Sequence, residues 1–218
     1  YMLNQNNLFF ILGTAVLYLF FKCNEEEKFS QTGGSLLNIY DEPLEPCDEG
    51  NMGSGSWDSQ GKCSELGGGI HQICFKNIDN PKLKFSQNTG QSDWSSNRNK
   101  NSNHCVCLGA WSLFVKKNKE NKNKYGKPNE LDSNKFLKCS AIPKVSLSKD
   151  YVGKFQGWDK WNGLEINGQT KEGVEKLVNI CHNQGNTNQK LNLKNNYCNF
   201  AKEIPSLKNS GLYKNLGC

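Results

Sequence analysis

Hydrophobic residues form one long continuous run in this chain, close to its first residue. Residues 1–21 carry no charged side chain, and within them the stretch LFFILGTAVLYLFF, Leu8–Phe21, is broken only by Gly13 and Thr14. A membrane span needs about 20 apolar residues, and the uncharged Asn and Gln side chains before Leu8 can extend the run to an interface. The basic start and small-residue cleavage site of a signal peptide are missing. We therefore predict a transmembrane anchor over 1–22 and a linker over 23–35.

After the linker, the hydrophobic positions fall into short groups with clear periods. Ile70–Ile78 alternates and predicts a short strand. A second group has the spacing of one helix face, and either Ser102 or Asn103 can cap that helix; its members are Val106, Cys107, Ala110, Trp111 and Phe114. The Lys- and Asn-rich stretch 116–130 that follows predicts a polar loop.

The second half of the chain contains weaker patterns. Phe136–Val145 is predicted to be extended, and Ser148 is predicted to cap a short helix ending at Phe155. Thr170 is predicted to cap a final helix whose apolar face consists of Val174, Leu177, Val178 and Cys181. Residues 183–218 are predicted to form an Asn/Lys-rich tail. The fold class is therefore α+β: one small Cys-rich domain over 36–182, with short strands, about three helices and long loops.

Ten cysteines in 218 residues are far more than ordinary use. Such density is typical of a disulfide framework in an oxidising compartment. Zinc is the alternative, but zinc knuckles separate paired ligands by about two to four residues and this chain has no C-x-x-C. Cys23, beside the anchor, and Cys218, at the end, are predicted to be unpaired or intermolecular. The disulfide candidates, whose connectivity stays open, are Cys47, Cys63, Cys74, Cys105, Cys107, Cys139, Cys181 and Cys198.

The composition of the basic residues gives no support for nucleic-acid recognition. Arg98 is the only arginine among the 27 basic side chains, and the chain contains 30 asparagines. Lys and Asn have AT-rich codons, so this bias is explained by genome composition. Proteins that read bases depend on bidentate arginine contacts. We therefore predict no specific nucleic-acid partner.

Several short motifs occur together in one order. They are LEPC at 44–47, the loop ending Gly61-Lys62-Cys63, HQIC at 71–74, Phe85-Ser86 before Gly90, and CVCLGAW at 105–111. This set, over roughly 36–181, resembles the domain-of-unknown-function family 2237, which has LEPC, DG-x-C, HTVC and W-C-L-C motifs. The resemblance implies a small domain of bacteria and algae with relatives in large DNA viruses. The family has no established activity, so the resemblance implies no catalytic residue.

These observations favour a membrane-anchored, disulfide-stabilised structural or interaction protein. Its predicted partners are a lipid membrane, through residues 8–21, and other proteins of a larger assembly. Given the AT-rich composition and the resemblance, we expect a minor capsid or membrane-associated protein of a large DNA virus, located in the virion. Outside a virus, it would lie in an oxidising extracytoplasmic compartment.

Two alternative functions remain open from the sequence. One is a thiol redox protein that uses Cys105 and Cys107 beside His104. The other is a glycan- or ligand-binding ectodomain that uses a patch at Trp158 and Trp161. No nucleophile elbow, phosphate-binding loop or HExxH motif occurs, so we predict no enzyme, no cofactor and no resident metal.

Overall fold

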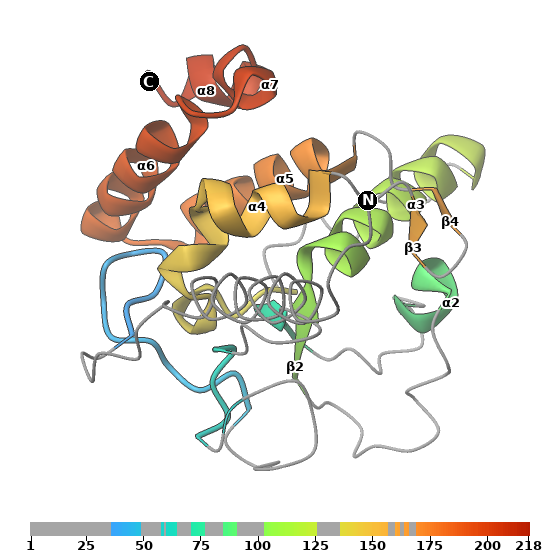
Figure 1. Ribbon diagram of the computed structural model, residues 1–218, viewed down its shortest axis with the longest axis horizontal. Coiled ribbons are helices and arrows are strands. Elements are labelled where there is room, and N and C mark those ends of the chain that lie inside the picture. Colours follow the sequence, from blue (N-terminus) through green and yellow to red (C-terminus); the bar gives the residue numbers. More distant parts are fainter. Residues whose placement is uncertain are drawn as a thin grey trace, which may run out of the picture. The chain divides into compact units, whose positions relative to one another are not determined.

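Short strands and helices are mixed in the first part of the described chain, and its last part is helical. The computed structural model describes residues 36–48, 58, 60–64, 71–76, 85–90, 103–125, 136–156, 160–161, 164–165 and 169–218. In chain order (Figure 1) the elements are β1 (His71–Phe75), α2 (Phe85–Thr89), β2 (His104–Cys107), α3 (Leu108–Tyr125), η2 (Cys139–Ala141), η3 (Lys144–Leu147), α4 (Lys149–Gln156), β3 (Lys160–Trp161), β4 (Leu164–Glu165), α5 (Gln169–Gln184), α6 (Thr187–Ala201), α7 (Pro205–Lys208) and α8 (Gly211–Asn215).

The strands pair in two small antiparallel sheets. β1 pairs with β2 so that Cys74 faces Cys105 and Phe75 faces His104, and the register shifts between His71 and Ile73. β3 pairs with β4 over two residues each. All four residues of β2 and the last four of β1 are buried, so this pair of strands lies inside the core.

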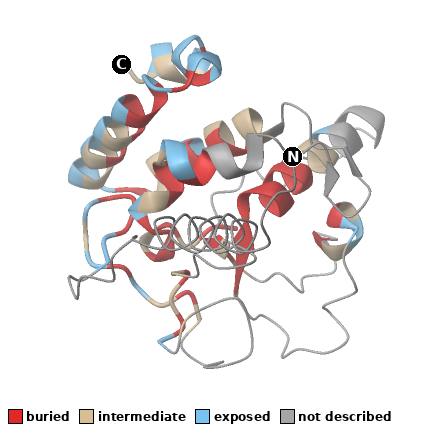
Figure 2. Cartoon of the chain, viewed as in Figure 1, coloured by how far each residue is buried: buried red, intermediate tan, exposed pale blue. Residues whose placement is uncertain are grey.

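An aromatic cluster joins the β1–β2 sheet to α2 and α3. The Phe75 ring centroid lies 4.9 Å from that of Phe85 and 5.2 Å from that of Phe114, in tilted and edge-on arrangements that aromatic rings favour. Trp111 is also fully buried against this cluster. The first turns of α3 are consequently buried on every side, as the continuous red of this segment shows (Figure 2).

Helix α5 packs closely against α3. The Trp111 indole Nε1 donates a hydrogen bond of 2.8 Å to the carbonyl oxygen of Gly173. A Cβ atom at Gly173 would lie only 2.1 Å from Ser112 Oγ, so this position requires a residue without a side chain. Glycine here lets the backbone of α5 approach α3.

Amide side chains of α6 hold the segment 36–48. Asn192 Nδ2 donates to the carbonyl oxygen of Tyr40 at 2.9 Å, and Asn196 Nδ2 donates to that of Ile39 at 3.2 Å. Gln189 Nε2 donates to both carboxylate oxygens of Glu42. The asparagines of this helix therefore hold in place, by hydrogen bonds, a loop that has little regular structure of its own.

Some of the predicted elements are present. The mixed helix-and-strand class is confirmed, and so are the strand at His71–Phe75 and the buried face of α5. The short helix after Ser148 is also confirmed, and Ser148 Oγ accepts a hydrogen bond of 3.2 Å from the backbone nitrogen of Tyr151. The anchor over 1–22 and the linker over 23–35 lie outside the described residues. Among the described residues, no helix combines the length and the apolar character that a membrane crossing requires.

Four predicted elements were wrong. The stretch 104–107 is a strand, and the helix begins at Leu108, because a short run that is buried all round has no period to separate strand from helix. That helix continues to Tyr125 through the predicted polar loop. In place of the extended strand over Phe136–Val145 the chain forms η2 and the start of η3, two 3-10 turns, although Leu137 forms an isolated bridge to Phe75.

The fourth correction concerns the end of the chain. Residues 183–218, predicted as a tail, form α6, α7 and α8 in the same compact unit as the residues from Leu36 onward. With them the helices of the described chain exceed the three expected. Leu193, Tyr197 and Leu207 are buried in the core, which explains why so polar a sequence still folds: one buried side chain every few residues is enough.

Candidate functional site

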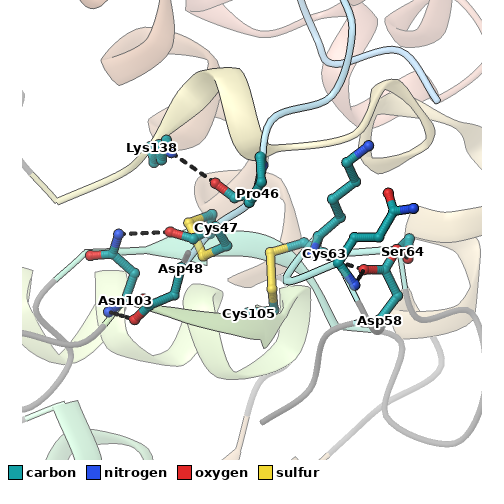
Figure 3. The surroundings of a disulfide bond; sticks show 12 residues. Pro46, Cys47, Asp48, Asp58, Cys63, Ser64, Asn103, Cys105 and Lys138 are labelled. Atoms are coloured by element: carbon teal, nitrogen blue, oxygen red, sulfur yellow. Dashed lines mark hydrogen bonds between the residues drawn. A yellow bond between two sulfur atoms is a disulfide. The ribbon is translucent and has the colours of Figure 1, made fainter. Parts of the chain in front are cut away.

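Four cysteines converge on the β1–β2 sheet. Cys74 of β1 and Cys105 of β2 are direct cross-strand partners, so their side chains leave the sheet on the same face. Each is bonded to a cysteine of a preceding loop: Cys47 to Cys74 with an S–S distance of 2.01 Å, and Cys63 to Cys105 with 2.04 Å. The two disulfides are therefore neighbours, and Figure 3 shows them side by side above β2. We name these four residues the cysteine cluster.

The loop that carries Cys63 is shaped by one carboxylate. Asp58 Oδ1 accepts hydrogen bonds from the backbone nitrogens of Gln60 at 2.8 Å and Lys62 at 3.0 Å. Asp58 Oδ2 accepts a bond of 2.6 Å from Ser64 Oγ (Figure 3). An aspartate that bonds to the backbone two residues ahead closes a compact turn. This turn presents Cys63 toward the sheet.

The same loop is pressed against the segment that carries Cys47. The backbone nitrogen of Cys47 donates a hydrogen bond of 2.7 Å to the carbonyl oxygen of Gly61. Gly61 has a φ of +73°, and a Cβ atom there would lie 2.5 Å from the carbonyl oxygen of Asp48. Positive φ and close approach together make glycine the fitting residue at this position.

Further hydrogen bonds fix the Cys47 segment from its other side. Asn103 Nδ2 donates to the carbonyl oxygen of Cys47 at 2.7 Å, and Lys138 Nζ donates to that of Pro46 at 2.8 Å (Figure 3). The backbone nitrogen of Asn103 also donates to Asp48 Oδ2 at 3.0 Å. Either Ser102 or Asn103 was predicted to cap a helix here; Asn103 instead precedes β2 and holds the Cys47 loop through these hydrogen bonds.

The other two disulfides bind the later elements. Cys139 of η2 is bonded to Cys181 of α5, and Cys198 of α6 is bonded to Cys218. The prediction that Cys218 is unpaired or intermolecular was wrong. The cause lies in α7 and α8, which fold back on α6 and bring the end of the chain within 5.4 Å, Cα to Cα, of Cys198. Cys23 lies outside the described residues.

Cys107 is the one disulfide candidate that the structure does not crosslink. It is a buried thiol at the residue before α3, and its Sγ accepts a hydrogen bond of 3.4 Å from the backbone nitrogen of Ala110. The sulfur thus occupies the helix N-cap, a position usually filled by an oxygen of Ser, Thr, Asp or Asn. The predicted reactive pair of Cys105 and Cys107 is not formed as a disulfide, because Cys105 is bonded to Cys63.

The surroundings of Cys107 are closed to solvent. Tyr151 neighbours Cys107 and shares its buried surroundings. Burial raises the pKa of Tyr151 well above its ordinary value and Cys107 raises it further, while backbone hydrogen bonds from Leu108 and Gln72 lower it. His104 is 3 % exposed. Reactive cysteines are usually partly exposed, so this thiol has the environment of a structural one.

The tryptophan patch predicted from the sequence falls on residues that the structure describes only in part. Trp158 lies outside the described residues, and of Trp161 only its backbone place in β3 is described. His182, on α5, has a lowered pKa through partial burial and the neighbouring Lys190 and Lys194. Among the described residues, one group of three or more metal-ligating side chains converges: the sulfurs of Cys47, Cys63 and Cys74 lie within 4.8 Å of one another.

Sequence reasoning found the cluster cysteines but not the residues that position them. Asp58 and Lys138 had no signal beyond being polar and close to cysteines, and Asn103 had a signal only as a candidate helix cap. Comparison with known proteins adds nothing to this geometry, since no family model, curated protein or solved structure matches the chain. The resemblance to the domain-of-unknown-function family stays a prediction.

Proposed function

We propose that this chain is a disulfide-stabilised structural or interaction protein, anchored in a membrane and carried as a component of a large DNA virus particle. The observation that carries the proposal is the use of eight cysteines as crosslinks. Their four disulfides link the segment 36–48, the sheet, η2, α5, α6 and the end of the chain.

The disulfides suit a protein that must persist outside a reducing compartment. They join residues 20 to 42 positions apart, and loops of that size correspond to about 3–4 kcal/mol each in the chain-entropy account. Seven of the eight bonded cysteines are buried, which slows the attack of reductants on most of the sulfurs. Such crosslinking is typical of secreted and particle-surface proteins.

The membrane and virion parts of the proposal are supported by the sequence alone. The apolar run at 8–21 supports a lipid partner, and the AT-rich composition with the family resemblance supports a large DNA virus. Other capsid proteins would be the protein partners. The single arginine argues against a sequence-specific nucleic-acid partner.

Two measurements test the proposal. The first is the intact mass of the full chain after alkylation in denaturant without reductant, in which we expect at most two of the ten cysteines to be labelled. The second is fractionation of the producing cells and of purified particles, with detection by antibody. We expect the protein in membranes and in particles. Labelling of six or more cysteines, or absence from both fractions, would falsify the proposal.

A further inference from the structure

We propose that the cysteine cluster is a redox-gated zinc site: once its two disulfides are reduced, Cys47, Cys63, Cys74 and Cys105 bind one Zn²⁺ as four thiolates. This inference goes beyond the proposed function and does not depend on it. The oxidised cluster is a pair of crosslinks, and the reduced cluster would keep the same loops together through a metal.

The sulfur positions fit this change with small movements. The Sγ atoms of Cys47, Cys63 and Cys74 lie within 4.8 Å of one another, and Cys105 Sγ is bonded to Cys63 Sγ. In a tetrahedral site with Zn–S bonds of about 2.3 Å, the sulfurs are about 3.8 Å apart. Bonded sulfurs would therefore separate by roughly 2 Å, and the non-bonded sulfurs among Cys47, Cys63 and Cys74 would approach by at most about 1 Å. Cys105 Sγ, which lies outside the 4.8 Å group and reaches it through Cys63 Sγ, would move the most.

The backbone of the cluster is held by contacts that reduction does not break. Cys74 and Cys105 remain cross-strand partners in the sheet, and the carbonyl oxygen of Cys74 accepts from the backbone nitrogen of Lys138 at 3.2 Å. The hydrogen bond from the backbone nitrogen of Cys47 to Gly61 keeps the two loops adjacent. The ligands are thus positioned before a metal arrives, which favours binding.

The four cysteines of the cluster are shielded from water, which affects their charge state after reduction. All four cysteines are 0–1 % exposed. Buried and without a metal, the reduced cysteines would be neutral thiols, and the two positive charges of Zn²⁺ allow them to lose their protons and bind as thiolates. The Lys138 ammonium group, which donates to the carbonyl oxygen of Pro46 at 2.8 Å, is already paired with Glu45 Oε2 at 3.5 Å, so the charge of the thiolates is offset by the metal itself.

The chemistry balances with a thiol or phosphine reductant. A dithiol gives each disulfide two electrons and two protons and becomes a disulfide itself; a phosphine gives two electrons, takes an oxygen from water and leaves that water's two protons on the sulfurs. Four thiols result from the two disulfides. Zn²⁺ then displaces four protons and binds four thiolates.

The other cysteines of the fold provide matched controls. Cys139–Cys181 and Cys198–Cys218 are disulfides of similar geometry that do not belong to the three-sulfur group. Cys107 lies on the same strand as Cys105 and is equally buried, yet it caps α3. A zinc site at the cluster would need none of these five residues.

The experiment uses the purified full chain reduced with a phosphine under nitrogen, supplied with one equivalent of Zn²⁺ and desalted. We expect about one zinc ion per chain by elemental analysis. Cys107→Ser and the double variant Cys139→Ser/Cys181→Ser should keep it, while Cys63→Ser/Cys105→Ser should lose it. Without phosphine treatment the wild-type chain should hold no zinc.

A second readout on the wild-type chain does not rely on any variant folding. Alkylation of the reduced, zinc-loaded chain, mapped by mass spectrometry, should leave the four cluster cysteines unmodified while the other accessible thiols react. Co²⁺ in place of Zn²⁺ should give the intense thiolate-to-metal absorption of a tetrahedral site. Loss of zinc on desalting, or protection of a different set of cysteines, would overturn the proposal. The disulfide count of the oxidised chain separates this outcome from failure of the proposed function.

Discussion

The contact between α3 and α5 at Gly173 gives a direct test of how this core is packed. A Cβ atom at position 173 would lie 2.1 Å from Ser112 Oγ, 2.9 Å from Ser112 Cβ and 3.1 Å from Ser112 Cα. Ser112 is fully buried, so it cannot avoid the new atom by turning outward into solvent. Gly173→Ala must therefore push the two helices apart.

The magnitude follows from three contributions. Overpacking of a core costs about 1–3 kcal/mol, and replacing glycine by alanine inside a helix returns about 1 kcal/mol. Separation of the helices also stretches the 2.8 Å hydrogen bond from Trp111 Nε1 to Gly173, and a buried donor that loses its partner costs about 1–3 kcal/mol. We expect a net loss of about 2–3 kcal/mol, which for a domain of this size lowers the melting temperature by about 5–10 °C.

Thermal unfolding under non-reducing conditions, followed by tryptophan fluorescence, measures this loss. Gly211→Ala is the matched control, because a Cβ atom there meets nothing within 4 Å, and its melting temperature should be unchanged or slightly higher. Adding Ser112→Gly to Gly173→Ala removes the two closest atoms and should recover part of the loss. The packing argument is refuted if Gly173→Ala melts with the wild type, or if Ser112→Gly recovers nothing.

Three further predictions concern single groups. Ser112→Ala should stabilise the protein by about 1 kcal/mol in denaturant unfolding, since its buried Oγ has no hydrogen-bond partner; equal or lower stability would contradict this. Tyr40→Phe should cost about 1–2 kcal/mol, because it removes the 2.7 Å hydrogen bond to the carbonyl oxygen of Cys181. Burial, and then the charge of Glu42, raise the pKa of Tyr40 above its ordinary value of 10.0. The unfolded chain therefore loses this proton at a lower pH than the folded chain, so the stability of the wild type falls as the pH rises above 10.0. The urea midpoint of Tyr40→Phe should fall less steeply than that of the wild type in this pH range. Removing the Cys198–Cys218 crosslink as a double serine variant should lower stability by about 3 kcal/mol from its separation of 20 residues, and an unchanged midpoint would show that α7 and α8 hold without it.

How far the fold could be predicted from sequence depended on whether an element had a free face. Helix α5 has an exposed side and a buried side, so Val174, Leu177, Val178 and Cys181 revealed it by their spacing. Strand β2 and the first turn of α3 are buried all round, and a continuous apolar run does not reveal where a strand becomes a helix. The helices after residue 186 were missed because single buried residues such as Leu193 and Tyr197 are diluted among polar side chains.

The candidate site could also be predicted only in part from the sequence. That cysteines would crosslink the domain could be predicted from their density alone, but pairing is a property of three-dimensional contacts. Cys47 and Cys63 meet Cys74 and Cys105 only because β1 pairs with β2 in one register. A shift of that register by one residue would put Cys74 and Cys105 on opposite faces and separate the two disulfides. Asp58, which shapes the Cys63 loop, had no sequence signal, and Asn103 had a signal only as a candidate helix cap.

In the segment HCVC, the position at which the strand ends determines which of the two cysteines forms a disulfide. Cys105 and Cys107 are two positions apart on one strand, so the sequence treats them alike. The strand ends at Cys107 and α3 begins at Leu108, which gives Cys107 a helix of backbone N–H groups to cap and leaves Cys105 within the paired sheet. A disulfide at Cys107 would remove its sulfur from Ala110 and leave an unsatisfied donor at the buried start of α3. The crosslink therefore belongs at Cys105, where the partner strand and the loop of Cys63 already meet.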